Sequence, residues 1–210
     1  MSADPSPPIW IELVRAVPSV VTAITAIVGV VIGARGLHRW RAEAIGKRKA
    51  ELAEEVLADF YQARDIIQAA RSPGSFGSEG STRAKADWES EDDTRTLNAY
   101  FATVERLNNQ RQFFAQLHAR RYRFIALFGL SAGEPYDDLF RIRSGIISAV
   151  QMLIMTHQNR DQGSLPTNRL EWQGIIWEGI NKPDPIPPHL DRIVAAIEDT
   201  CRPAIQEAVK

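Results

Sequence analysis

The chain has 210 residues, of which 24% are charged, and a formal net charge of −1. This balance excludes the basic footprint that nucleic-acid binding across the whole chain would need. The single cysteine, Cys201, excludes an intramolecular disulfide and any metal site built from several cysteines, and it fits a reducing, cytosolic environment.

An uncharged run of 19 residues, Ala16–Ala34, lies between two arginines near the start of the chain. As a helix it would extend roughly 28 Å, close to the thickness of the hydrocarbon core of a bilayer. We therefore predict a transmembrane helix over residues 16–35, with Trp10 and Trp40 as interfacial anchors. A cleaved signal peptide would have a shorter apolar run, and a core helix of a small domain is seldom uncharged over such a length.

Basic residues directly follow this predicted span. Six of them lie in residues 35–49, against the single acid Glu43: Arg35, Arg39, Arg41, Lys47, Arg48 and Lys49. Basic flanks remain on the cytoplasmic side, so we expect residues 1–15 outside and residues 36–210 in the cytosol, as in a single-pass inner-membrane protein. We name these six residues the basic cluster. It also has the charge to hold anionic lipid headgroups, which makes membrane lipid a predicted partner.

Apolar residues at steps of three and four predict four helices after the span. The first continues from the span and ends near Arg71. The second runs from Asp87 or Asp92 to Phe128, the third from Pro135 to Asn159, and the fourth from His189 to Val209. The predicted core positions are Leu52, Val56, Phe60, Ala63, Ile67, Ala70, Leu97, Phe101, Val104, Leu107, Phe114, Leu117, Phe124, Phe128, Leu139, Ile142, Ile146, Val150, Leu153, Ile154, Leu190, Ile193, Ile197, Cys201 and Ile205. The fold class is therefore all-α: an N-terminal transmembrane helix followed by an antiparallel bundle of about four helices.

Three segments interrupt these helices. Residues 72–86 are rich in Gly and Ser and predict a flexible loop, which we name the glycine-rich loop. Residues 169–181 fit a short helix or a strand equally well, because two glycines weaken both. Residues 182–188 (KPDPIPP) are expected to be extended, because proline disfavours helix before it.

Small residues lie one helical turn apart within the predicted span, at Thr25, Gly29 and Gly33. In lipid, such a face lets two backbones approach closely, so it permits a homodimer or higher oligomer. The alternative is chance, since glycine is common in spanning helices.

The glycine-rich loop also resembles a phosphate-binding loop in composition, through Gly74, Gly77, Gly80, Ser81 and Arg83. Amides freed by glycine can point at a phosphate. A phosphate-binding loop, however, follows a strand and carries a Lys after its last Gly, and this loop follows a helix and has no such Lys. A plain connector is the favoured interpretation.

No motif in the chain identifies a catalytic, cofactor or metal site. The four histidines have no metal-ligand spacing, and there is no HExxH or GxSxG motif. Tyr61, Arg64 and Asp65 face a neighbouring helix in the predicted bundle. We expect Asp65 to pair with Arg111, or Arg64 with Glu105, in contacts that fix register.

The stretch Phe60–Gly80 (FYQARDIIQAARSPGSFGSEG), on a basic helix behind an N-terminal span, resembles a set of uncharacterised bacterial single-pass inner-membrane proteins with a cytosolic helical domain. The resemblance implies a bacterial membrane setting and brings no activity with it.

These patterns predict a membrane-anchored, non-enzymatic interaction or scaffold module at the cytoplasmic face, with a protein partner that the sequence does not identify. One alternative is a ligand- or nucleotide-responsive sensor or enzyme that uses Gly74–Arg83. Another is an oligomeric membrane effector, which the absence of charge within the span argues against.

Overall fold

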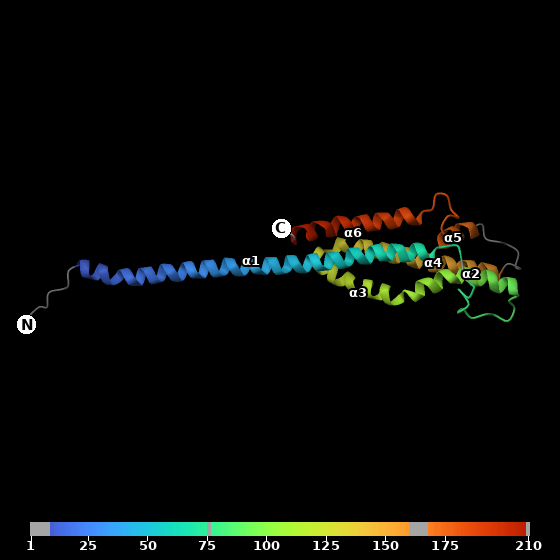
Figure 1. Ribbon diagram of the computed structural model, residues 1–210, viewed down its shortest axis with the longest axis horizontal. Coiled ribbons are helices and arrows are strands. Elements are labelled where there is room, and N and C mark those ends of the chain that lie inside the picture. The colour runs from blue at the N-terminus through green and yellow to red at the C-terminus, as the bar shows by residue number, and fades with distance from the viewer. Residues whose placement is uncertain (1–8, 75–76, 160–167, 209–210) are drawn as a thin grey trace, which may run out of the picture. The chain divides into compact units, whose positions relative to one another are not determined.

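The computed structural model describes residues 9–74, 77–159 and 168–208, and within these ranges the chain contains helices and turns but no strand (Figure 1). The six α-helices and one 3-10 helix are α1 (Ile9–Ala70), α2 (Glu91–Asn109), α3 (Arg111–Phe128), η1 (Leu130–Gly133), α4 (Glu134–Gln158), α5 (Arg169–Ile176) and α6 (Ile186–Ala208). The all-α prediction is confirmed. The chain divides into two units, Met1–Arg48 and Lys49–Lys210, which are described separately below.

In the first unit, residues 9–48 form the N-terminal part of α1. The backbone over the predicted span is helical. The side chains of residues 9–24, 26–28, 31, 38 and 42 lie outside the described residues, as do residues 1–8. Of the apolar side chains that are described, Val30 and Ile32 are 71% and 65% exposed.

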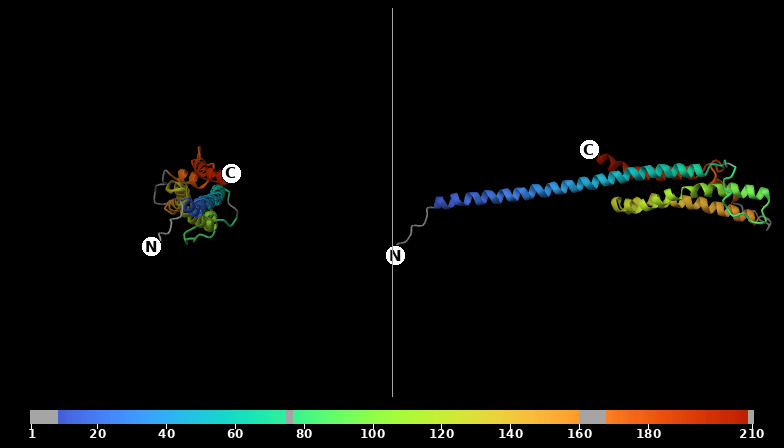
Figure 2. Two further views of the ribbon diagram at one scale, coloured as in Figure 1. Left: turned by 90° about the vertical axis from the view of Figure 1, so that its left-hand side faces the viewer. Right: turned by 60° about the horizontal axis from the view of Figure 1, so that its bottom comes forward.

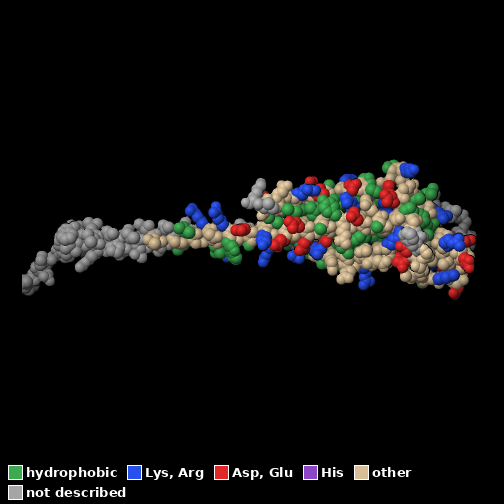
Figure 3. Space-filling model, viewed as in Figure 1, with side chains coloured by type: hydrophobic (Ala, Val, Ile, Leu, Met, Phe, Trp, Pro, Cys, Tyr) green, Lys and Arg blue, Asp and Glu red, His purple; other side chains and the backbone are tan. Residues whose placement is uncertain are grey.

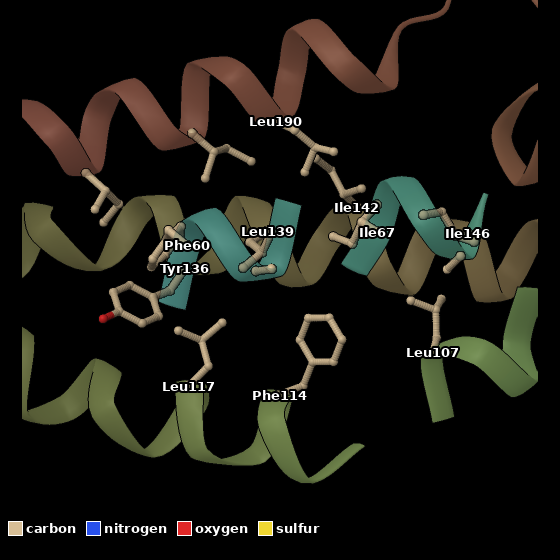
Figure 4. Packing of buried hydrophobic residues seen from close by; sticks show 14 of the residues in the cluster. Phe60, Ile67, Leu107, Phe114, Leu117, Tyr136, Leu139, Ile142, Ile146 and Leu190 are labelled. Atoms are coloured by element: carbon tan, nitrogen blue, oxygen red, sulfur yellow. The ribbon is translucent and has the colours of Figure 1, made fainter. Parts of the chain in front are cut away.

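The second unit is an antiparallel helical bundle, as predicted. The C-terminal part of α1, the α2–α3 pair, α4 and α6 run alongside one another in alternating directions (Figures 1 and 2). Side chains from these helices meet in one hydrophobic cluster, in which Phe60 of α1 lies close to Tyr136 of α4 (Figure 4). The two rings pack edge to face with their centroids 4.8 Å apart. All six core positions predicted on α1 are at most 2% exposed, so burial explains their spacing.

The predicted second helix is wrong in one respect, because it is two helices and not one. α2 ends at Asn109, and Gln110 adopts φ −100° and ψ 15° before α3 begins. The run Asn108-Asn109-Gln110 has little preference for continuing a helix, since asparagine side chains compete for backbone hydrogen bonds. The ends of the pair match the prediction. Ser90 and Asp93 form a capping box at the start, and Gly129 ends α3 with a φ of +98°.

The ambiguous segment 169–181 forms the short helix α5, and α6 begins within the segment that was predicted to be extended. Pro187 and Pro188 occupy the first turn of α6, where proline needs no amide partner. The Asp184 carboxylate accepts a hydrogen bond from the Ile186 amide, 3.0 Å away, and so caps this helix start.

Arg71 connects α1, α5 and the segment before α6. Its side chain is fully buried. It donates hydrogen bonds to the carbonyl oxygens of Ile175 (2.8 Å) and Gly174 (2.9 Å), and it forms an ion pair of 2.8 Å with Asp184. Its own carbonyl oxygen accepts a hydrogen bond from the Glu178 amide at 2.9 Å. A cation at the last carbonyls of α5 also stabilises that helix end.

Among the described residues, one helical stretch, Leu130–Gln158, is long and apolar enough to cross a membrane, judged by length and composition. It is 33% buried over its most apolar window. Within the bundle, α4 packs against α2, α5 and α6. Leu139, Ile146 and Leu153 are at most 1% exposed. These contacts favour the predicted central helix of a bundle over a second span.

We expect Tyr136→Phe to leave the free energy of unfolding unchanged or to raise it by up to about 1 kcal/mol. The Tyr136 hydroxyl is buried and has no hydrogen-bond partner among the described residues. Tyr100→Phe is the matched control. The Tyr100 hydroxyl accepts hydrogen bonds from Arg169 (3.0 Å) and Gln173 (3.1 Å), so its loss should cost about 1 kcal/mol.

The measurement is denaturant unfolding of the full chain in detergent. Equal destabilisation by the two substitutions would contradict the prediction, because it would mean that the Tyr136 hydroxyl has a partner.

Candidate functional site

The face predicted to self-associate lies in the first unit. Thr25, Gly29 and Gly33 are exposed, and a Cβ atom added at either glycine would meet nothing within 4 Å. The same holds at Gly36 and Gly46. The face is therefore open to a partner helix, but openness alone does not distinguish these glycines from the others on α1.

The basic cluster divides into two parts. Arg35, Arg39, Arg41, Lys47 and Arg48 belong to the first unit and are exposed. No ion pair joins them to an acid within the described ranges. Lys49 belongs to the bundle, where its ammonium group lies 5.6 Å from the centroid of the Phe128 ring. This cation–π contact sets Lys49 apart from the other five.

In the glycine-rich loop, Gly80 is buried against α2. Its φ is +79°, and a Cβ atom at this position would overlap the carbonyl oxygen of Asn98. Its amide donates a hydrogen bond to the Glu105 carboxylate. A carboxylate thus occupies the position at which a bound phosphate would accept from this amide. Ser81 bonds locally, through its hydroxyl to the Ser78 carbonyl oxygen at 2.6 Å.

Arg83 is held by an acid that follows the loop, three residues after its end. Its guanidinium forms an ion pair with Glu89, and both side chains are at least nine-tenths buried. Arg83 also donates to the Asn98 side-chain oxygen at 2.7 Å. The hydrogen bond from Arg83 lowers the pKa of Glu89 to about 2, against the opposing effect of burial. Arg83 is therefore engaged inside the protein and does not face an open binding site.

Arg106, which no sequence motif singles out, holds the start of this loop. The Arg106 guanidinium donates to the carbonyl oxygens of Ser72 (2.8 Å) and Gly74 (2.5 Å) and pairs with Glu79 at 2.5 Å. A cavity of about 380 Å³ lies beside it, lined also by Ile66 of α1. Together with Arg83 and Gly80, Arg106 attaches the described part of the loop to α2. Gly74 and Gly77 are exposed.

The predicted cross-helix pairs are wrong. Arg64 contacts its neighbour Asp65 at 3.3 Å. Glu105 instead accepts from Gly80. The long-range polar contacts use other residues: Tyr61 donates to Glu198 of α6, and Arg120 of α3 pairs with Asp59 of α1. The hydrogen bond to Glu198 raises the pKa of Tyr61. These contacts fix the register of the helices, which is the role predicted for the pairs.

Reactive groups are few in the part of the chain that the structure describes. No group of three or more His, Cys, Asp or Glu side chains there has the geometry to hold a metal ion. Burial raises the pKa of the Cys201 thiol to about 12, so the thiol is protonated at neutral pH and is a poor nucleophile.

A cavity of about 590 Å³ lies between the start of α4 and α6. Its lining combines Glu134 and Asp138 with His189 and Arg192. This mixture of charges does not point to one class of ligand.

Comparisons with known proteins add no family: no protein-family model, curated protein or solved structure matches the chain.

We expect Glu89→Gln to lower the free energy of unfolding by about 3 kcal/mol at neutral pH, because it leaves the Arg83 guanidinium buried and unpaired. The wild-type contribution also depends on pH. The folded-state pKa of Glu89 lies below its ordinary value, so the stabilisation is present above about pH 4.5 and is lost as the pH falls toward 2.

Urea unfolding of the full chain in detergent at several pH values measures both effects. Asp92→Asn is the control, since the Asp92–Arg95 pair is exposed and contributes at most about 1 kcal/mol. A Glu89→Gln variant as stable as the Asp92→Asn variant would show that the Arg83–Glu89 pair does not hold the loop.

Proposed function

We propose that the chain is a membrane-anchored interaction or scaffold module without enzymatic activity. In this proposal residues 16–35 cross a bacterial inner membrane once, and the helical bundle lies at its cytoplasmic face. The observation that carries the proposal is the exposure of Val30 and Ile32, at 71% and 65%, within a run of 19 residues without charge. Lipid is the solvent that such side chains favour.

The contrast between these exposed apolar residues and the bundle supports the proposed membrane anchor. There, most apolar positions of the long helices are buried against neighbouring helices, and the surface mixes acidic and basic side chains (Figure 3). Along the described part of the first unit, Lys and Arg side chains follow directly after the exposed apolar residues. An uncharged helix that ends in a basic flank is typical of a span whose flank is cytoplasmic.

The sensor or enzyme that would use Gly74–Arg83 is the weaker proposal. Glu105 accepts from the Gly80 amide, and Glu89 neutralises Arg83. An anionic ligand would have to displace both carboxylates before it could bind this loop. We therefore propose a structural role for the loop.

The anchor is tested by placing charge in the span. We expect Ala23→Arg with Ala26→Arg to move the full chain from the membrane fraction to the soluble fraction, because each arginine costs about 3 kcal/mol at the centre of a span. The control adds the same charges outside the span, at the exposed residues Ala44 and Ile45, and should leave the chain in the membrane.

Resistance to alkaline extraction measures the partition, and protease digestion of sealed vesicles reports on which side the bundle lies. Wild-type protein that is extracted by alkali would contradict the proposal.

The proposed self-association has its own test. We expect Gly29→Ile with Gly33→Ile to abolish chemical cross-linking of the full chain in micelles, because the larger side chains keep two backbones apart. Gly46→Ile is the control, since this position is equally open but lies outside the predicted span. Unchanged cross-linking of the double variant would show that the chain does not associate through this face.

A further inference from the structure

The five cations Arg35, Arg39, Arg41, Lys47 and Arg48 surround α1 and do not line one side of it. Successive residues of an α-helix turn by about 100°, which places Arg39 about 40° from Arg35 and Arg41 about 240° from it. Lys47 and Arg48 fall at about 120° and 220°. A helix that lies flat on a membrane has its cations on one face and its apolar residues on the other. This distribution suits a helix that passes through a charged layer.

These cations are also not neutralised by the described chain. In the bundle, arginines find acidic partners, such as Arg106 with Glu79 and Arg121 with Asp137. Between residues 35 and 48 the only acid is Glu43, against five cations. The excess of positive charge is exposed, so it is available to an anion from outside the protein.

Apolar side chains lie among the first three of these cations. Leu37 is 48% exposed and Trp40 is 66% exposed. Tryptophan beside arginine at the end of an apolar helix is typical of the headgroup region of a membrane, where one part of the ring meets lipid and the other meets water. The anion at this level is therefore a lipid headgroup and not a soluble acid.

The distance along the α1 axis from the end of the proposed span separates the cations into two groups. The headgroup layer of each leaflet is about 5–8 Å thick. At about 1.5 Å per residue, Arg35 to Arg41 extends about 9 Å along the axis and fills that layer. Lys47 and Arg48 lie about 18–20 Å from Arg35, which places them more than a Debye length of about 8 Å beyond the layer.

We propose that Arg35, Arg39 and Arg41 form a binding site for the phosphate groups of anionic phospholipids in the leaflet next to the bundle, and that Lys47 and Arg48 contribute little to it. The inference rests on the proposed span, because only a helix that crosses the membrane at residues 16–35 places these three arginines among headgroups.

The test uses the full chain in nanodiscs of equimolar phosphatidylcholine and phosphatidylglycerol. Native mass spectrometry counts the lipids of each kind that stay bound when the disc is disrupted. We expect wild-type protein to retain mainly phosphatidylglycerol. The triple variant R35Q/R39Q/R41Q should lose this preference by about tenfold or more, since each arginine near the surface contributes about fivefold.

Two controls separate position from charge. K47Q/R48Q removes the two cations beyond the headgroup layer, and K85Q/R111Q/R123Q removes three exposed cations of the bundle. Both should keep the wild-type lipid ratio. A loss of preference in either control equal to that of the triple variant, or no loss in the triple variant, would overturn the inference.

Insertion is scored separately by co-elution of the chain with the discs. Wild-type protein that does not enter the discs would contradict the proposed span. Protein that enters the discs but retains both lipids equally would leave the span standing and overturn only the lipid site.

Discussion

The buried guanidinium of Arg71 is the constraint on which the arrangement of the C-terminal half depends. A cation without water is costly unless its hydrogen bonds are satisfied, and here the carbonyls of Gly174 and Ile175 and the Asp184 carboxylate satisfy most of them. The end of α1, the end of α5 and the start of α6 must therefore meet at one side chain. This requirement places α5 across the end of the bundle and sets where α6 begins. The Arg71 Nη1 atom has no partner among the described residues, so the hydrogen bonds of the guanidinium are satisfied only in part.

The long helices were predictable from the sequence because their signal is local. Val56, Phe60 and Ile67 repeat at the spacing of one helical face, and that face is the one the bundle buries. The apolar pattern continues across the break at Gln110, where only one residue leaves the helical conformation, so periodicity did not predict it and the only local signal was the low helix preference of the two asparagines before it. The segment of α5 was ambiguous because a short helix with a glycine is stabilised by tertiary contacts. One of these contacts is the Gln173 side chain with the Tyr100 hydroxyl.

In the candidate sites, too, features set by neighbouring residues were predictable and features set by contacts between distant residues were not. The five exposed cations of the first unit were predictable, since a run of charge is a property of neighbouring residues. The exception, Lys49, packs on Phe128, which lies two helices later in the chain. The glycines of the loop could not be interpreted from spacing alone. A glycine that frees an amide for phosphate and a glycine that lets the backbone approach Asn98 look the same in sequence. Only the non-local partners, Glu105 and Glu89, separate the two roles.

Charge pairing within the bundle also bears on where an external partner meets this protein. An exposed ion pair adds little to stability, but it removes both charges from the surface available to a ligand. Arg120 and Asp59, and Arg121 and Asp137, are used in this way between helices. The bundle also exposes apolar residues such as Leu130 and Tyr122, and single residues of this kind are ordinary on protein surfaces. The first unit differs on both counts, because its apolar run is continuous in sequence and its cations are left unpaired within the described chain. The exposed apolar side chains and the cations without an acidic partner in the described chain therefore lie together along residues 25–48, where the proposed membrane with anionic lipid would contact both.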